Sequence, residues 1–207
     1  MQANLFDDSS NPDQFIQHDL GDSDIKEYPC AFAHSQSNIL LQQLIDSIPW
    51  HQESIKIAGK VIQIPRLQCW MGDAQSVYGY SGMRLKPIAW NQLVTGIRDR
   101  VQILSNSAFN SVLINYYRSG DDSVAWHADD EPELGSNPVI ASVSFGAERY
   151  FQLKQKHSAK PQKFQLKLRN GSLLIMGGSL QNNWLHQLPK VKGLALPRIN
   201  LTFRNIV

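Results

Sequence analysis

Two stretches of the chain repeat apolar residues with the period of an amphipathic helix. Between Ser35 and Ile48 the apolar side chains recur three and four positions apart, and Pro49 ends the pattern. A second stretch starts at Pro87, a residue that the first turn of a helix tolerates, and continues to Leu104. Each stretch predicts a helix with one apolar face, so both need a surface to cover.

After residue 108 the pattern changes to short runs of β-branched and aromatic residues, separated by turn signals such as Asn170-Gly171. The predicted strands are Ser111–Tyr117, Val139–Phe145, Arg149–Leu153, Phe164–Leu168, Ser172–Met176 and Ile199–Val207. Strands at a spacing of roughly ten residues favour a sandwich or barrel over a parallel α/β sheet. We therefore predict an α+β fold in which two N-terminal helices back an antiparallel sandwich of jelly-roll type.

Composition narrows the class of protein. The chain has 207 residues, of which 42% are apolar, and this suits one globular domain. Two cysteines, Cys30 and Cys69, are too few for a disulfide framework and fit no paired-cysteine zinc site, which favours a reducing compartment. The start is polar and acidic, and no apolar run is long enough to cross a bilayer. We expect a cytoplasmic protein, or a nuclear one in a eukaryote, that is monomeric and does not enter a membrane.

Charge is distributed unevenly along the chain. Residues 1–29 hold seven acidic residues against Lys26 alone, whereas residues 30–207 carry an excess of eight positive charges. The acidic composition predicts an N-terminal tail over 1–29 that is poorly ordered or laid along the body, followed by one domain over 30–207. A basic body suits a polyanionic partner through counterion release, although it also serves solubility alone.

A candidate metal site begins at His127-Ala128-Asp129. In an extended segment, residues i and i+2 point to the same face, so the imidazole and the carboxylate are presented together. This spacing alone is common and usually gives a surface hydrogen bond. A later histidine, His186, follows an apolar strand and a Gly-Gly turn. Two histidines and one carboxylate can form the facial triad that leaves coordination positions open on Fe(II) for a cosubstrate and dioxygen.

The C-terminal strand carries a second candidate site. Alternation places Arg198, Asn200, Thr202 and Arg204 on one face and the apolar residues on the other. This pattern is also typical of a solvated edge strand. Guanidinium groups bind carboxylates in bidentate fashion, however, so two arginines near an iron site suggest a small dicarboxylic acid as cosubstrate. On an earlier strand, Asn115 and Tyr117 share a face and can add hydrogen bonds to the same ligand; Tyr116 faces the other way.

Four segments of the chain closely resemble the AlkB family of nucleic-acid demethylases. They are Phe109–Tyr117, Ser123–Glu131, Ile140–Ala147 and Pro197–Arg204. The resemblance runs in order from about Pro65 to the C-terminus and implies a double-stranded β-helix, which is a jelly roll. It also implies an enzyme that uses Fe(II), 2-oxoglutarate and O2 to remove methyl groups from 1-methyladenine and 3-methylcytosine, with formaldehyde, succinate and CO2 as products.

The resemblance assigns roles to individual residues. The implied Fe(II) ligands are His127, Asp129 and His186. The implied contacts to 2-oxoglutarate are Asn115, Tyr117, Arg198, Thr202 and Arg204, and Asn200 joins them on the same strand face. Arg198 takes the far carboxylate and Arg204 the end nearer the metal.

The substrate side is implied by further residues. The acidic pair Asp130 and Glu131 follows the metal carboxylate, and the family places the first of these against the base, where negative charge favours a cationic methylated base; the alternative is a solvated loop. Tyr78, Tyr80 and Ser81 match a segment that lines the base pocket, although two tyrosines can equally pack a hairpin. Candidate phosphate contacts are Arg66, Lys60, Arg84 and Lys86.

One departure from the family bears on the nucleic-acid partner. Relatives that repair duplex DNA wedge a bulky apolar residue into the base stack, and Ala58 occupies that position in Ile57–Lys60. A methyl group cannot fill the hole left by a base, so we expect single-stranded DNA to be favoured, with RNA as an alternative partner. Two other functions stay open: the same oxygenase acting on a small molecule or protein, and a jelly-roll binding protein without catalysis.

Overall fold

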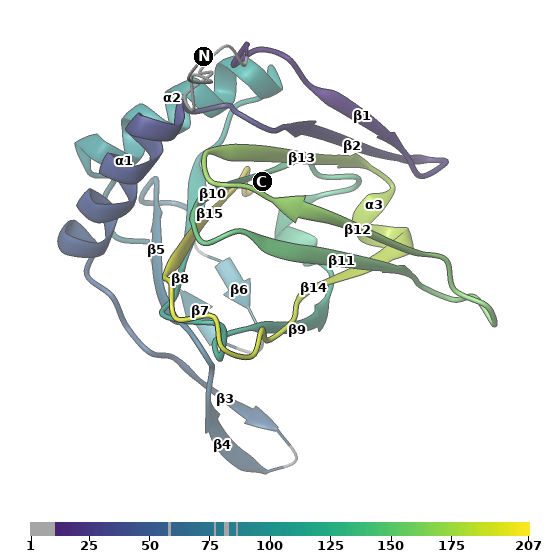
Figure 1. Cartoon of the computed structure of the whole chain (residues 1–207). Helices are drawn as coiled ribbons and strands as arrows, with labels where there is room; N and C mark the ends of the chain where they lie inside the picture. The colour runs from purple at the N-terminus through teal and green to yellow at the C-terminus, as the bar shows by residue number, and fades with distance from the viewer. Residues whose placement is uncertain (1–10, 58, 77, 81–82, 86) are drawn as a thin grey trace.

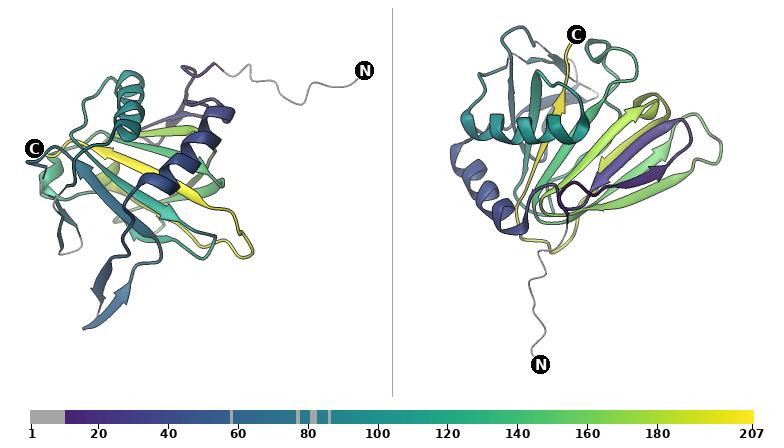
Figure 2. Two further views of the ribbon diagram at one scale, coloured as in Figure 1. Left: turned by 90° about the vertical axis from the view of Figure 1, so that its left-hand side faces the viewer. Right: turned by 90° about the horizontal axis from the view of Figure 1, so that it is seen from above.

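The computed structural model describes residues 11–57, 59–76, 78–80, 83–85 and 87–207. Two β-sheets face one another, and two helices cover the outer face of the larger sheet (Figures 1 and 2). All paired neighbours within both sheets run antiparallel. The arrangement is the jelly roll predicted from the strand pattern, with helices outside it.

The two sheets contain eleven of the described strands. In spatial order the larger sheet is β1 (Ile16–Asp19), β2 (Ser23–Tyr28), β13 (Ser172–Gly178), β10 (Ile140–Gly146), β15 (Arg198–Arg204), β8 (Ser111–Tyr117) and β5 (Leu67–Gly72). The smaller sheet is β12 (Lys163–Leu168), β11 (Arg149–Gln155), β14 (Trp184–Leu188) and β9 (Val124–His127). Separate hairpins pair β3 (Ser54–Ile57) with β4 (Lys60–Gln63) and β6 (Tyr78–Tyr80) with β7 (Met83–Leu85).

The predicted strands lie where expected, with small differences at their ends. Strand β8 has the predicted bounds, whereas β15 ends at Arg204 and does not continue to Val207. Its ladder with β8 stops at Arg204, and beyond it the Ile206 backbone N–H donates to the side chain of Asn110. The sequence pattern missed the short strands β9 and β14, which carry the candidate metal ligands His127 and His186.

Helix α1 (His34–Ser47) forms as predicted, but helix α2 (Gln92–Ser105) begins later than its apolar pattern. The Asn91 side chain accepts the Val94 N–H at 2.8 Å and caps the helix. The preceding Ile88 exchanges backbone hydrogen bonds with Trp70 and Gly72, so Pro87 precedes a strand-like contact and not a first helical turn. Among the described residues, no helix is long and apolar enough to span a membrane.

Part of the acidic N-terminal region, which the sequence predicts to be a poorly ordered tail or a segment laid along the body, forms a strand. Ser23–Tyr28 is not a poorly ordered tail: it pairs with β13 and is part of the larger sheet. Ile25 is fully buried, and Glu27 is buried with Arg169 and His18 as partners. The described residues of this region therefore match the other alternative, a segment laid along the body, because β2 is a strand of the larger sheet.

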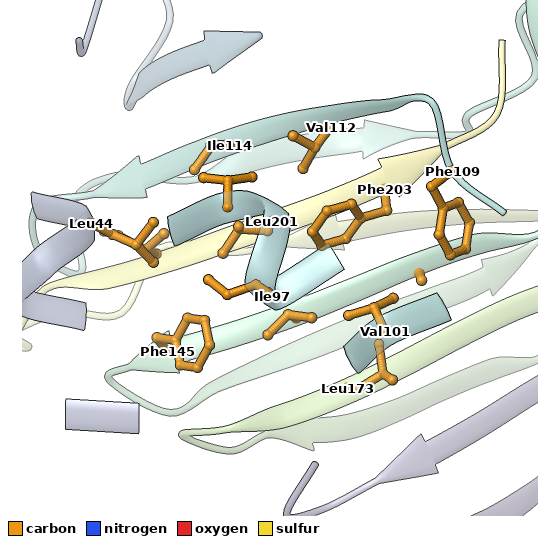
Figure 3. Packing of buried hydrophobic residues seen from close by; sticks show 14 of the residues in the cluster. Leu44, Ile97, Val101, Phe109, Val112, Ile114, Phe145, Leu173, Leu201 and Phe203 are labelled. Carbon is orange, nitrogen blue, oxygen red and sulfur yellow. The ribbon is translucent and has the colours of Figure 1, made fainter. Parts of the chain in front are cut away.

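Two apolar clusters position the larger sheet. One lies between the helices and the sheet's outer face, where Leu44 of α1 and Ile97 of α2 pack against strand residues such as Leu201 (Figure 3). The other lies between the two sheets and includes Leu113 and Trp184. The polar face of β15 points toward the space between the sheets, where it lines a pocket that can hold a ligand.

Candidate active site

The metal-binding candidates are brought together by strand register. Strands β9 and β14 pair so that His127 lies directly opposite His186, with the ring centres 4.2 Å apart. Asp129 follows two residues after His127, in the loop that leaves β9. One ligand atom from each of the three residues lies within 4.8 Å of the others. The two histidines and one carboxylate therefore converge on one point.

Hydrogen bonding leaves the expected ligand atoms available. His127 Nδ1 lies 2.8 Å from the Ala125 carbonyl oxygen, so it donates there and Nε2 carries the free lone pair. That nitrogen is 3.8 Å from Asp129 Oδ1, a buried oxygen with no hydrogen-bond partner among the described residues. A buried carboxylate oxygen without a donor is unfavourable unless a cation binds it. The residues thus fit a divalent iron.

Burial and charge set the protonation states of the three residues. Burial lowers the pKa of His186 to about 3, and burial also lowers the pKa of His127. Burial alone would raise the pKa of Asp129, but the nearby Arg204 guanidinium and the two imidazoles outweigh it and hold that pKa below its usual range. At neutral pH both imidazoles are uncharged and the carboxylate is ionised, which are the metal-binding forms.

The polar face of β15 lines the same pocket as the triad. Because β15 lies in the middle of the larger sheet, between β10 and β8, its polar residues are not a solvated edge. Arg198, Asn200, Thr202 and Arg204 all line the pocket, together with Asn115 and Tyr117 of β8. The pairing puts Arg198 opposite Tyr117 and Asn200 opposite Asn115. The structure therefore brings all six predicted cosubstrate residues together.

Arg198 lies at the end of β15 opposite to Arg204, the arginine that bonds to Asp129. Its guanidinium donates to Ser144 Oγ at 2.9 Å and lies 5.1 Å from the Tyr117 ring centre, and its Nε is buried without a hydrogen-bond partner. Burial lowers its pKa to about 10, so the group stays charged at neutral pH. Within the described part of the chain no carboxylate pairs with it. A buried cation in this state favours binding of an anion such as a carboxylate.

Arg204 marks the metal end of the pocket. Its Nη2 donates to Asp129 Oδ2 at 2.7 Å, and both side chains are almost fully buried. Arg204 thus holds one carboxylate oxygen and leaves the other facing His127. The two arginines lie six residues apart, at the two ends of β15.

The other polar residues of the pocket are already engaged with the protein. Asn200 donates to Ser142 Oγ and to the Val143 carbonyl, and it accepts the Thr202 hydroxyl at 2.9 Å. Asn115 Oδ1 accepts from Arg66 Nε at 2.8 Å, so its Nδ2 group is the one able to donate to a ligand. Asn200 therefore ties β15 to β10, and Thr202 holds the Asn200 amide in place.

Comparison with known proteins agrees with this geometry. The family model of the 2OG-Fe(II) oxygenase superfamily matches residues 26–204. The chain belongs to this superfamily. It is 37% identical over 189 residues to the human DNA oxidative demethylase ALKBH2, a match that covers 87% of this chain and 72% of that protein. These two findings confirm the AlkB family, which uses Fe(II), 2-oxoglutarate and O2.

Other relatives extend the comparison. The human alkB homolog 3, an alpha-ketoglutarate-dependent dioxygenase, is 36% identical over 187 residues, which is 86% of this chain and 65% of that protein. The chain thus spans about two thirds of the length of that relative. Among solved structures, OsALKBH1 matches with a TM-score of 0.59 at 16% identity, covering 92% of this chain and 100% of that chain. At this identity the likeness shows the fold alone, and the jelly roll is confirmed.

The structure describes some of the predicted substrate residues fully and others only in part. Asp130 is half exposed next to the metal ligand, but its carboxylate pairs with Lys156 at 2.8 Å. Ser81 lies outside the described residues, and of Tyr78 and Tyr80 only the backbone of β6 is described. Glu131 is partly buried at the start of the short 3-10 helix Pro132–Leu134.

Arg66 is buried, which argues against the predicted contact with a phosphate. It is 4% exposed, donates to Asn115 and to the Ser123 carbonyl, and lines the metal pocket. A side chain held in this way is part of the pocket wall and does not reach a phosphate backbone. Of the other basic candidates, Lys60 is exposed at the start of β4, Arg84 has only its β7 backbone described, and Lys86 lies outside the described residues.

Three residues at the site were missed by sequence reasoning. Arg149 is buried behind the Tyr117 ring, 6.0 Å from its centre, and donates to the Asp122 and Pro189 carbonyl groups. Gln181 and Lys156 contact the loop that carries Asp129 and Asp130. No local signal marks them, because each lies in an ordinary strand end or short helix and reaches the site only through the fold.

Proposed function

We propose that this protein is an Fe(II)- and 2-oxoglutarate-dependent dioxygenase that demethylates alkylated bases in DNA. The observation that carries the proposal is the pairing of two features in one pocket. A convergent His127, Asp129 and His186 cluster lies at one end, and the buried Arg198 cation without a carboxylate partner lies at the other. A metal ion and a dicarboxylate satisfy both features together.

The chain's own residues have separable roles in this proposal. When bound, iron with 2-oxoglutarate and O2 would supply the oxidising step that removes an N-methyl group as formaldehyde, with succinate and CO2 as the other products. Arg198 binds the far carboxylate, and Tyr117 with Ser144 fixes the plane of its guanidinium. Arg204 keeps Asp129 ionised and oriented. Phe151 and Met176 line the pocket with apolar surface and limit water beside the metal.

We infer that the substrates are 1-methyladenine and 3-methylcytosine, in DNA and with RNA as an alternative. Support comes from the relatives named DNA oxidative demethylases and from the acidic pair Asp130 and Glu131 beside the metal ligand. Both methylated bases are cationic at neutral pH, so negative charge there favours them over ordinary bases. Because Lys156 offsets part of the charge of Asp130, we expect Asp130 to contribute less than the sequence alone predicts.

The decisive experiment measures products with defined oligonucleotides. Purified protein with Fe(II), 2-oxoglutarate and O2 should release formaldehyde and succinate in equal amounts from an oligonucleotide with one 3-methylcytosine, and little from the unmodified strand. His127→Ala should abolish this release while its circular dichroism spectrum stays like that of the parent, because the triad supplies all the expected protein ligands.

Two outcomes would contradict the proposal. Full activity in His127→Ala would remove the metal assignment. Succinate release that does not depend on the methylated base, with no formaldehyde, would point to the same oxygenase chemistry on a small molecule or a protein.

A further inference from the structure

The loop that carries Asp129 has no support from a β-ladder of its own. Residues 128–131 lie beyond the end of β9, outside any helix or strand, yet Asp129 is 1% exposed. A buried backbone N–H needs a hydrogen-bond partner, because leaving it unpaired costs free energy. The Asp129 N–H donates at 3.0 Å to Gln181 Oε1.

Gln181 is a rigid support for this hydrogen bond. It lies in the short helix α3 (Leu180–Asn183), between β13 and β14, and is 2% exposed. Its Nε2 group also lies 3.9 Å from Met176 Sδ of β13, which restricts rotation of the amide. Helix α3 directly precedes the strand that carries His186, so the same short segment holds Asp129 and leads to another metal ligand.

Lys156 ties the next residue of the loop to the same helix. Its Nζ donates at 2.8 Å to the Gln181 carbonyl and at 2.8 Å to Asp130 Oδ2. Its backbone N–H donates at 2.7 Å to the Asn183 carbonyl, so Lys156 is anchored to α3 at two points. The lysine side chain is 13% exposed, which makes it a largely desolvated cation between the loop and the helix.

Together with Arg204, these contacts define the direction of the Asp129 carboxylate. Gln181 fixes the backbone on one side, and Arg204 holds Oδ2 on the other. Only Oδ1 then faces His127 Nε2, at 3.8 Å. We propose that Gln181 and Lys156 are positioning residues that hold the Asp129–Asp130 loop so that Oδ1 points at the metal; the inference rests on the metal site of the proposed function.

Metal affinity in the absence of turnover tests this role. Mn(II) binding to the metal-free, full-length chain is followed by the electron paramagnetic resonance signal of the free ion, at a temperature where every variant is folded. Gln181→Met keeps the side-chain volume and removes the oxygen acceptor, and it should weaken Mn(II) binding about tenfold or more, as loss of an outer partner of a metal ligand does. Asn182→Ala, on the same helix but bonded to Asn137, is the matched control and should leave the affinity unchanged.

For Lys156, a role through charge alone and a positioning role predict opposite changes in Mn(II) affinity. If Lys156 acted only through its charge, Lys156→Met would remove a cation near the metal and tighten Mn(II) binding. Positioning predicts the reverse: weaker binding in Lys156→Met, by several-fold, and recovery in Lys156→Arg, which can keep the ion pair with Asp130. Lys167→Met removes an exposed ion pair with Glu148 and serves as the control.

The outcomes separate this inference from the proposed function. Mn(II) affinity within twofold of the parent in Gln181→Met, or tighter binding in Lys156→Met, would overturn the positioning role while the metal site stands. A parent chain that binds no Mn(II) would overturn the metal site and the positioning role together. A loss of unfolding free energy with unchanged affinity would show a purely structural role and would also overturn the inference.

Discussion

At the scale of single residues, Arg198 combines full burial with a positive charge. It is 2% exposed, and its hydrogen bond to Ser144 is with a neutral hydroxyl. A buried charge that lacks a counterion is unfavourable for the folded state. A bound dicarboxylate removes that disadvantage, so the fold itself favours an anionic ligand at this position.

Replacing Arg198 should specifically weaken the binding of 2-oxoglutarate. Arg198→Lys keeps the charge and loses the planar fork, so we expect the 2-oxoglutarate concentration for half-maximal rate to rise about tenfold or more, from loss of a charge-assisted bond of about 1.5–3 kcal/mol. Steady-state succinate release measures it. Arg169→Lys, at an exposed arginine paired with Glu27, should leave that concentration unchanged. The same 2-oxoglutarate requirement in both variants would show that Arg198 does not bind it.

Cys69 offers a prediction that depends on burial alone. Burial raises the pKa of its thiol to about 12, whereas Cys30 is partly exposed. In the native protein at pH 8, iodoacetamide should modify Cys30 and leave Cys69 unmodified, and both should react in urea; peptide mass spectrometry reads the outcome. The unfolded thiol ionises at a lower pH than the folded one, so this group reduces stability as the pH rises from about 9 toward 12. Rapid native labelling of Cys69 would contradict its burial.

At the scale of elements, β2 shows how a strand can be hidden by acidic composition. Ser23, Ile25 and Glu27 are buried, whereas Asp24 and Lys26 between them are exposed, which is the period of two of a strand with one covered face. The strand also covers the edge of β13, whose backbone groups would otherwise be open to pairing with another chain.

A single substitution tests whether this strand is integral to the domain. Ile25→Ala should lower the unfolding free energy by about 2–5 kcal/mol, because the side chain is fully buried between the sheets. Ile16→Ala in β1, where the side chain is 47% exposed, should change it by about 0.5 kcal/mol or less. Urea unfolding of the metal-free protein measures both. If both substitutions change the unfolding free energy by the same small amount, the N-terminal region behaves as a tail and not as part of the domain.

At the scale of the whole molecule, the hairpin of β3 and β4 projects from the body (Figure 1). Ile57 and Lys60 pair across its turn, and Ala58 between them lies outside the described residues. Val61 and Ile62 on β4 are exposed, at 74% and 47%. An apolar, protruding hairpin suits contact with exposed bases, but the residue at the turn position is small.

We therefore predict a preference for single-stranded over double-stranded DNA. Demethylation of 3-methylcytosine should be faster in a single-stranded oligonucleotide than in the matched duplex, because alanine offsets little of the few kcal/mol lost in unstacking a base. Ala58→Phe should narrow the difference. Both rates are compared at one salt concentration, because phosphate contacts make binding depend on salt. Equal or faster repair of the duplex by the parent chain would contradict the prediction.

Much of the fold and of the cosubstrate face could be predicted from local patterns. The alternation in Arg198–Arg204 places polar residues on one face, and that in Ser111–Tyr117 places Asn115 and Tyr117 on a shared face, because residues i and i+2 of any strand point the same way. The six strands predicted from runs of β-branched and aromatic residues lie close to their predicted bounds, because such side chains fit a half-buried sheet surface. The three residues predicted as metal ligands lie together in the structure, and their role as ligands stays a prediction.

Tertiary structure alone decided how these segments meet. The register of β9 and β14 sets His127 opposite His186, 59 positions away in the chain, and Arg204 reaches Asp129 across 75 positions. Gln181 and Lys156 support the metal loop, and β2 joins the sheet despite its acids. Such contacts depend on strand order and on the partners that packing supplies, such as Arg169 for Glu27. Local propensity carries no information about them, because each is stabilised by residues distant in sequence.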